Sequence, residues 1–104
     1  MIKVGVIGAG HLGKIHLDIL KKSNRYRLIG FYDNNENNIQ ELIKSEEYNS
    51  YKSLEELIDK VDLVDIVTPT LSHYEIALLS INKGKHVFIE KPIASSIIEA
   101  KKIT

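Results

Sequence analysis

The chain contains no cysteine, only two prolines, and equal numbers of acidic and basic residues, 14 of each, among its 104 residues. Without cysteine it cannot form disulfides, hold a metal through thiolates or use a thiol nucleophile. A formal net charge of zero gives it no general attraction to nucleic acid or to an anionic membrane. Its four histidines are scattered, so we expect no metal site. No apolar run approaches the roughly 20 residues of a membrane-spanning helix, and none fits a signal peptide, which favours the cytoplasm.

Short β-branched runs alternate with helical patterns along the chain, which is typical of parallel βαβ units. The predicted strands are 3–7, 28–32, 49–51, 63–67 and 86–89, and the predicted helices are 11–22, 35–44, 54–59, 72–82 and a last one from 96 onward. We expect one α/β domain with a Rossmann, doubly wound parallel sheet. It should have about five strands in the order 3-2-1-4-5, with helices on both faces. The usual six strands are not reached, and the last helical pattern still runs at Thr104, so we expect a piece of a longer polypeptide.

Helix ends are marked by capping residues. Ser53 and Glu56 form a capping box that begins a short helix, and Ser72 and Glu75 form a second one. Gly84 is expected to end the helix that follows. In the first helix one face is apolar and is expected to pack on the sheet, through Leu12, Ile15, Ile19 and Leu20.

The turn after the first strand follows the glycine pattern of a dinucleotide site: Gly8, Ala9, Gly10, His11, Leu12 and Gly13. Gly8 permits a tight exit from the strand, Gly10 lets a pyrophosphate approach the backbone, and Gly13 lets the helix lie close to the sheet. Free N–H groups at the helix start would face the phosphates. The pattern alone is a weak signal, and a merely structural glycine turn is the alternative. Its place between a strand and an amphipathic helix favours the dinucleotide site.

Asp33 ends the second predicted strand about 20 residues after Gly13, where an acid would accept hydrogen bonds from the adenosine ribose. A 2′-phosphate would meet a like charge there, and no arginine follows, so NAD is favoured over NADP. Asn34 is assigned to the same cofactor site. The alternative for Asp33 is a helix or turn cap. The asparagine-rich stretch 33–38 is otherwise interpreted as a polar loop and helix start on the surface.

Further motifs follow in a fixed order: Thr68-Pro69-Thr70, Ser72-His73, Gly84-Lys85-His86-Val87 and Glu90-Lys91-Pro92. Together with the glycine turn they resemble the N-terminal domain of the glucose-fructose oxidoreductase / inositol dehydrogenase / MocA family. The resemblance covers residues 2 to about 94. The Glu-Lys-Pro tripeptide is its most specific element and the Thr-Pro turn comes next.

This resemblance implies an NAD-dependent dehydrogenase that transfers hydride between the nicotinamide and a hydroxyl or carbonyl of a sugar, polyol or related substrate. It places Lys91 at the reacting oxygen as a catalytic residue, with Pro92 fixing its turn. The remaining family positions would contact the cofactor: Thr68, Pro69, Thr70, His73, Glu90, Lys91 and Pro92. The family usually carries asparagine at position 70, so a contact through that amide is lost here.

The family's Asp and His catalytic pair lies in a C-terminal substrate domain that residues 1–104 do not contain. We therefore expect this dinucleotide-binding domain to bind its cofactor with little turnover of its own, and the full-length protein to be a homo-oligomer. The alternative function is a non-catalytic nucleotide-sensing module with a Rossmann fold. A methyltransferase-like domain would also use a glycine turn and an acid, but not the Thr-Pro and Glu-Lys-Pro motifs.

Overall fold

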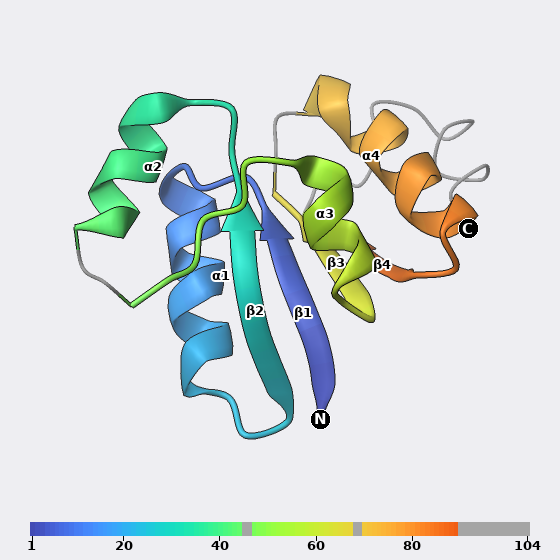
Figure 1. Ribbon diagram of the computed structural model, residues 1–104, viewed down its shortest axis with the longest axis horizontal. Helices are drawn as coiled ribbons and strands as arrows, with labels where there is room; N and C mark the ends of the chain where they lie inside the picture. The colour runs from blue at the N-terminus through green and yellow to red at the C-terminus, as the bar shows by residue number, and fades with distance from the viewer. Residues whose placement is uncertain (45–46, 68–69, 90–104) are drawn as a thin grey trace.

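Parallel strands and helices alternate along the chain (Figure 1). The computed structural model describes residues 1–44, 47–67 and 70–89, with the backbone alone at 70–73. Its elements are β1 (Ile2–Ile7), α1 (His11–Lys22), β2 (Tyr26–Tyr32), α2 (Glu36–Ile43), α3 (Leu54–Asp59), β3 (Leu63–Ile66), α4 (Thr70–Asn82) and β4 (His86–Ile89). The predicted helix from 96 onward lies outside the described residues.

The strands form one parallel sheet in the order β2-β1-β3-β4. From β1 the chain first moves outward to β2 and later returns to the other side of β1 to form β3. The strand order therefore reverses between β1 and β3, and the crevice at the carboxyl ends of these strands is where open α/β sheets bind ligands. The predicted α/β Rossmann class is confirmed.

The predicted strand at 49–51 is reduced to a single parallel bridge between Ser50 and Phe31. Two backbone hydrogen bonds of 2.9 Å hold it, from Phe31 to the Asn49 carbonyl and from Tyr51 to the Phe31 carbonyl. The segment lies beside β2, the place that the predicted order gives it. In the described part of the sheet the ladder does not extend beyond this bridge.

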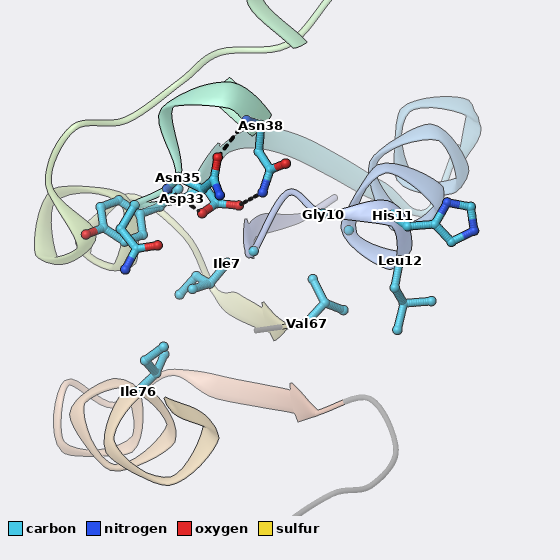
Figure 2. Close-up of a pocket in the computed structure, with 13 residues that line it drawn as sticks. Ile7, Gly10, His11, Leu12, Asp33, Asn35, Asn38, Val67 and Ile76 are labelled. Atoms are coloured by element: carbon cyan, nitrogen blue, oxygen red, sulfur yellow. Dashed lines mark hydrogen bonds between the residues drawn. The ribbon is translucent and has the colours of Figure 1, made fainter. Parts of the chain in front are cut away.

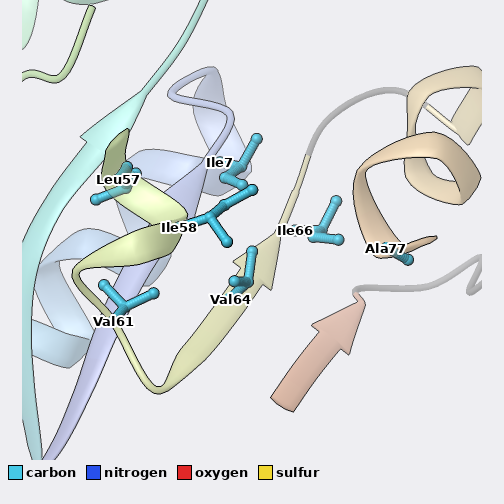
Figure 3. Close-up of a cluster of buried hydrophobic side chains, with 7 residues drawn as sticks. All are labelled: Ile7, Leu57, Ile58, Val61, Val64, Ile66 and Ala77. Atoms are coloured by element: carbon cyan, nitrogen blue, oxygen red, sulfur yellow. The ribbon is translucent and has the colours of Figure 1, made fainter. Parts of the chain in front are cut away.

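Helices cover both faces of the sheet, as predicted. On one face α3 and α4 pack over a cluster of buried side chains (Figure 3): Ile7, Leu57, Ile58, Val61, Val64, Ile66 and Ala77. On the other face α1 and α2 pack over a second cluster: Val6, Ala9, Leu17, Phe31 and Leu42. Neighbouring residues of β1 belong to different clusters because side chains alternate along a strand.

The buried face of α1 differs from the prediction. Gly13 and Leu17 are buried, whereas Leu12, Ile15 and Ile19 are 40, 42 and 60% exposed. The cause is the close approach of α1 to the glycine turn, because a Cβ atom on Gly13 would overlap the carbonyl of Gly8. This contact fixes the rotation of α1, and it turns most of the apolar stripe toward solvent.

The structure agrees with one of the two predicted N-caps and differs from the other. Ser53 accepts a hydrogen bond of 3.3 Å from the Glu56 N–H, as predicted. The next long helix, α4, begins at Thr70, so Ser72 lies inside its first turn and is not the N-cap.

The end of α4 is closed by Gly84 in a left-handed conformation, with φ of 77°. Its N–H donates to the Ile81 carbonyl over 2.9 Å, and the Lys85 N–H donates to the Ser80 carbonyl over 3.0 Å. The predicted C-terminal cap is confirmed. Among the described ranges, none of the helices has the length and apolar character needed to cross a bilayer.

The contrast between Ser53 and Ser72 can be measured. Ser53→Ala removes the acceptor for the Glu56 N–H and should lower the free energy of unfolding by about 1 kcal/mol. Ser72→Ala should change it by less than about 0.5 kcal/mol, because alanine is a better helix former than serine inside a turn. Urea unfolding followed by circular dichroism compares the two variants. Equal losses would contradict the start of α4 at Thr70.

Candidate functional site

A cleft of about 480 Å³ opens at the carboxyl ends of β2, β1 and β3 (Figure 2). One wall is the glycine turn with the start of α1, and another is the end of β2 with the start of α2. Val67 and Ile76 add an apolar wall from beyond β3 and from α4. The cleft therefore lies at the crevice that the strand order predicts.

The glycine turn shapes the floor of the cleft. Gly8 has a φ of 106°, which favours glycine, and its N–H donates to the Tyr32 carbonyl over 2.8 Å. Gly10 is the N-cap of α1 and makes no side-chain capping bond. A Cβ atom on Gly10 would have no neighbour within 4 Å, so its α-carbon borders open space. The first N–H groups of α1 have no partner within the helix, and the turn leaves room for an anion beside them.

The carboxylate of Asp33 joins the end of β2 to both neighbouring elements. Its Oδ2 accepts the Ala9 N–H over 2.7 Å and the side-chain amide of Asn38 over 3.0 Å. Its Oδ1 accepts the Asn35 N–H over 2.8 Å. Asn35 in turn caps α2, because its side chain accepts the Asn38 N–H over 3.2 Å. The acid is thus held in one orientation at the cleft.

Most of the site residues predicted from the first third of the sequence meet at this cleft: Gly8, Gly10, His11, Leu12, Gly13, Asp33 and Asn34. Ala9 is fully buried and contributes through its backbone N–H to Asp33. The His11 ring points away from the cleft in Figure 2, so this residue serves the site through its backbone.

The later predicted residues are only partly placed. Thr70 and His73 lie in the first turn of α4, and the structure describes only their backbone. The other five predicted positions lie outside the described residues: Thr68, Pro69, Glu90, Lys91 and Pro92. Their roles stay predictions.

Two site residues were missed by the sequence interpretation. Asn35 and Asn38 line the cleft and hydrogen-bond to Asp33, whereas the sequence interpretation gave these two residues of stretch 33–38 no role beyond a polar loop and helix start. The available signal was an asparagine at the helix start followed by a second one three residues later. This spacing places the N-cap residue next to a residue in the first turn of the same helix.

A buried ion pair lies outside this cleft, between α1 and β3. His16 Nδ1 is 2.6 Å from Asp65 Oδ2, and the side chains are 14 and 7% exposed. His16 and Asp65 were not connected in the sequence analysis. The signal was an acid inside the apolar run 63–67, because a buried carboxylate needs a partner.

Among the described residues, three side chains with shifted pKa values lie at contacts between elements. A hydrogen bond from Lys14, together with its charge, holds the pKa of Glu41 below its usual value. Burial raises the pKa of the Tyr48 phenol, and a hydrogen bond to Asp59 raises the pKa of Lys83. None of the three shifted groups lines the cleft. They therefore indicate packing between elements and not acid–base chemistry at the site.

Known proteins have sequences similar to that of this chain. A family model described as an oxidoreductase family with an NAD-binding Rossmann fold matches residues 2–104. Glucose-6-phosphate 3-dehydrogenase from Bacillus subtilis is 37% identical over 100 residues, which cover 96% of this chain and 29% of that enzyme. The chain thus spans less than a third of this relative.

Solved structures share its fold. Biliverdin reductase from Synechocystis, solved with biliverdin and NADP+, has a TM-score of 0.89 and 29% identity, with coverage of 98% of this chain and 33% of that one. GenD2 from gentamicin A biosynthesis, solved with NAD, has a TM-score of 0.88 and 29% identity, with coverage of 98% and 30%. Similar structures therefore hold either nicotinamide dinucleotide.

The packing role of Gly13 leads to a stability prediction. Gly13→Ala forces α1 away from the Gly8 carbonyl and should lower the free energy of unfolding by about 2–3 kcal/mol. Gly10→Ala is the matched control, because its methyl group meets open space, and it should cost less than about 1 kcal/mol. Urea unfolding measures both values. A Gly13→Ala variant as stable as wild type would contradict the close contact.

Proposed function

This chain belongs to the glucose-fructose oxidoreductase / inositol dehydrogenase / MocA family of oxidoreductases, with its NAD-binding Rossmann fold, and from that premise we propose that it binds NAD in preference to NADP. The observation that carries the proposal is the Asp33 carboxylate, held at the end of β2 and lining the cleft. The family rests on the family model, which is described as an NAD-binding Rossmann fold, whereas the choice between the two dinucleotides is our inference.

The glycine turn fits the pyrophosphate. Gly10 offers open space where a side chain would stand, and the start of α1 offers N–H groups without intrahelical partners. The positive end of the helix dipole favours an anion at the same point. No acidic side chain lies in the first turn of α1 to oppose it.

The end of β2 fits an unphosphorylated ribose. The Asp33 carboxylate can accept hydrogen bonds from ribose hydroxyls. A 2′-phosphate at about 4 Å from it would cost about 1 kcal/mol per charge pair in a water-like dielectric and about 4 kcal/mol at an effective dielectric of 20. No lysine or arginine is among the described residues that line the cleft to offset this repulsion.

We further propose a hydride-transfer reaction on a sugar, polyol or related hydroxyl compound. When bound, the nicotinamide supplies the hydride acceptor or donor. The sugar class is supported by the likeness to a glucose-6-phosphate 3-dehydrogenase. Lys91 is proposed to hydrogen-bond the reacting oxygen, on the strength of the family motif alone, since it lies outside the described residues.

The substrate part is proposed to lie in a further domain of a longer polypeptide, since the chain spans 29% of that dehydrogenase. Exposed apolar side chains support this proposal. Ile19 and Phe88, 60 and 52% exposed, border a groove of about 520 Å³ on the α1 face of the sheet. The cytoplasmic location and the homo-oligomer remain predictions.

Cofactor binding through the glycine turn is tested with Gly10→Ala. Its methyl group would occupy the space of the pyrophosphate, so we expect NAD affinity to fall by at least about tenfold, a loss of about 1.4 kcal/mol. Isothermal titration calorimetry measures the dissociation constant, and thermal unfolding confirms that the variant is folded. Unchanged NAD affinity in a folded variant would place the dinucleotide elsewhere.

A second test concerns the proposal that the substrate-binding part lies in a further domain. Residues 1–104 should bind NAD saturably but should not reduce it above background when glucose 6-phosphate or myo-inositol is added. The reason is that the substrate-binding part is proposed to lie outside this chain. NADH formation is followed by absorbance. Sustained turnover by this chain alone would contradict the proposed two-domain arrangement.

A further inference from the structure

Asn38 lies in the first turn of α2 with its side chain at the cleft (Figure 2). Its amide nitrogen donates to Asp33 Oδ2 over 3.0 Å. The helix start does not need this side chain, because Asn35 already caps α2 by accepting the Asn38 backbone N–H. The side chain of Asn38 is therefore committed to the acid of the cleft and not to its own helix.

The hydrogen bond from Asn38 uses one of the few acceptor positions of the Asp33 carboxylate. An ionised carboxylate offers about four lone-pair positions. Ala9 and Asn38 take two positions on Oδ2, and the Asn35 N–H takes one on Oδ1. About one position remains for a ligand. A ribose that presents two hydroxyl groups therefore needs a second acceptor beside Asp33.

The amide oxygen of Asn38 is in the right place to be that acceptor. Figure 2 shows it directed away from the Asp33 carboxylate, on the same side chain whose nitrogen faces Asp33. The donation to Oδ2 fixes this orientation, because turning the amide over would bring its oxygen against a carboxylate oxygen. The fixed orientation presents an acceptor, which suits a hydroxyl group and opposes a phosphate.

We propose that Asn38 is a specificity-determining residue that selects the unphosphorylated adenosine ribose together with Asp33. Asp33 Oδ1 accepts one ribose hydroxyl and the Asn38 amide oxygen accepts the other. A 2′-phosphate would meet two acceptors, the Asp33 carboxylate and the Asn38 amide oxygen, where each ribose hydroxyl can donate a hydrogen bond. This inference rests on the proposed NAD site and adds a residue to it.

The test compares Asn38→Leu with wild type on three probes, each titrated by calorimetry: NAD, NADP, and the form of NAD that lacks both hydroxyls on its adenosine ribose. Leucine keeps the size of asparagine and removes both its donor and its acceptor. Asn37→Leu is the matched control, since Asn37 is exposed, neighbours Asn38 on α2 and does not line the cleft. Asn38→Ala serves as a second variant, and thermal unfolding checks that each is folded.

We expect Asn38→Leu to weaken NAD by about fivefold, the scale of a hydrogen bond between neutral groups. It should leave the dideoxy form within about twofold of wild type, because the lost contact depends on the missing hydroxyls. NADP should bind the variant as well as, or better than, wild type, and Asn37→Leu should match wild type on every probe. Asn38→Ala should follow Asn38→Leu.

Equal weakening on all three probes would show a structural role and overturn the inference, and so would unchanged NAD affinity. In both cases wild type still binds NAD, so the proposed function stands. A wild-type chain that binds neither NAD nor NADP would overturn the proposed function and, with it, the role of Asn38.

Discussion

The site depends on one carboxylate that joins three segments. Asp33 ends β2, holds the glycine turn through the Ala9 N–H and holds the start of α2 through Asn35 and Asn38. These bonds connect residues up to 24 positions apart along the chain. Because both oxygens are held, the acid keeps one orientation and the cleft is formed before any ligand arrives. Preorganisation of this kind lowers the ordering cost of binding.

A second constraint sets the position of α1. The contact of Gly13 with the Gly8 carbonyl fixes how closely the helix approaches the sheet and which face it buries. The His16–Asp65 ion pair joins the same helix to β3 one turn further along. The start of α1 therefore lines the cleft, while Leu12, Ile15 and Ile19 of its apolar stripe stay exposed and Leu20 packs against the second cluster. The contact at Gly13 therefore leaves most of the apolar stripe of α1 exposed.

Local rules predicted much of this arrangement and long-range contacts explain the rest. Strand and helix periods, the Ser53 cap, the Gly84 cap and the glycine turn are encoded by near neighbours, and the structure confirms them. The orientation of α1 was mispredicted because a backbone contact of Gly13, invisible to hydrophobic periodicity, outweighs apolar burial. The asparagines of α2 were missed because their partner, Asp33, is recognised only once the turn is folded. A single bridge stands in place of the predicted strand at 49–51.

The central claim is that the charge of Asp33 organises the cleft for NAD. The most direct measurement is the ratio of NADP to NAD dissociation constants, by calorimetry, for wild type and for Asp33→Asn, which keeps the shape and removes the charge. The account predicts that wild type binds NAD at least about tenfold more tightly than NADP, and that Asp33→Asn moves the ratio toward one. A wild type that binds NADP equally or more tightly, or a ratio that the substitution leaves unchanged, would contradict it.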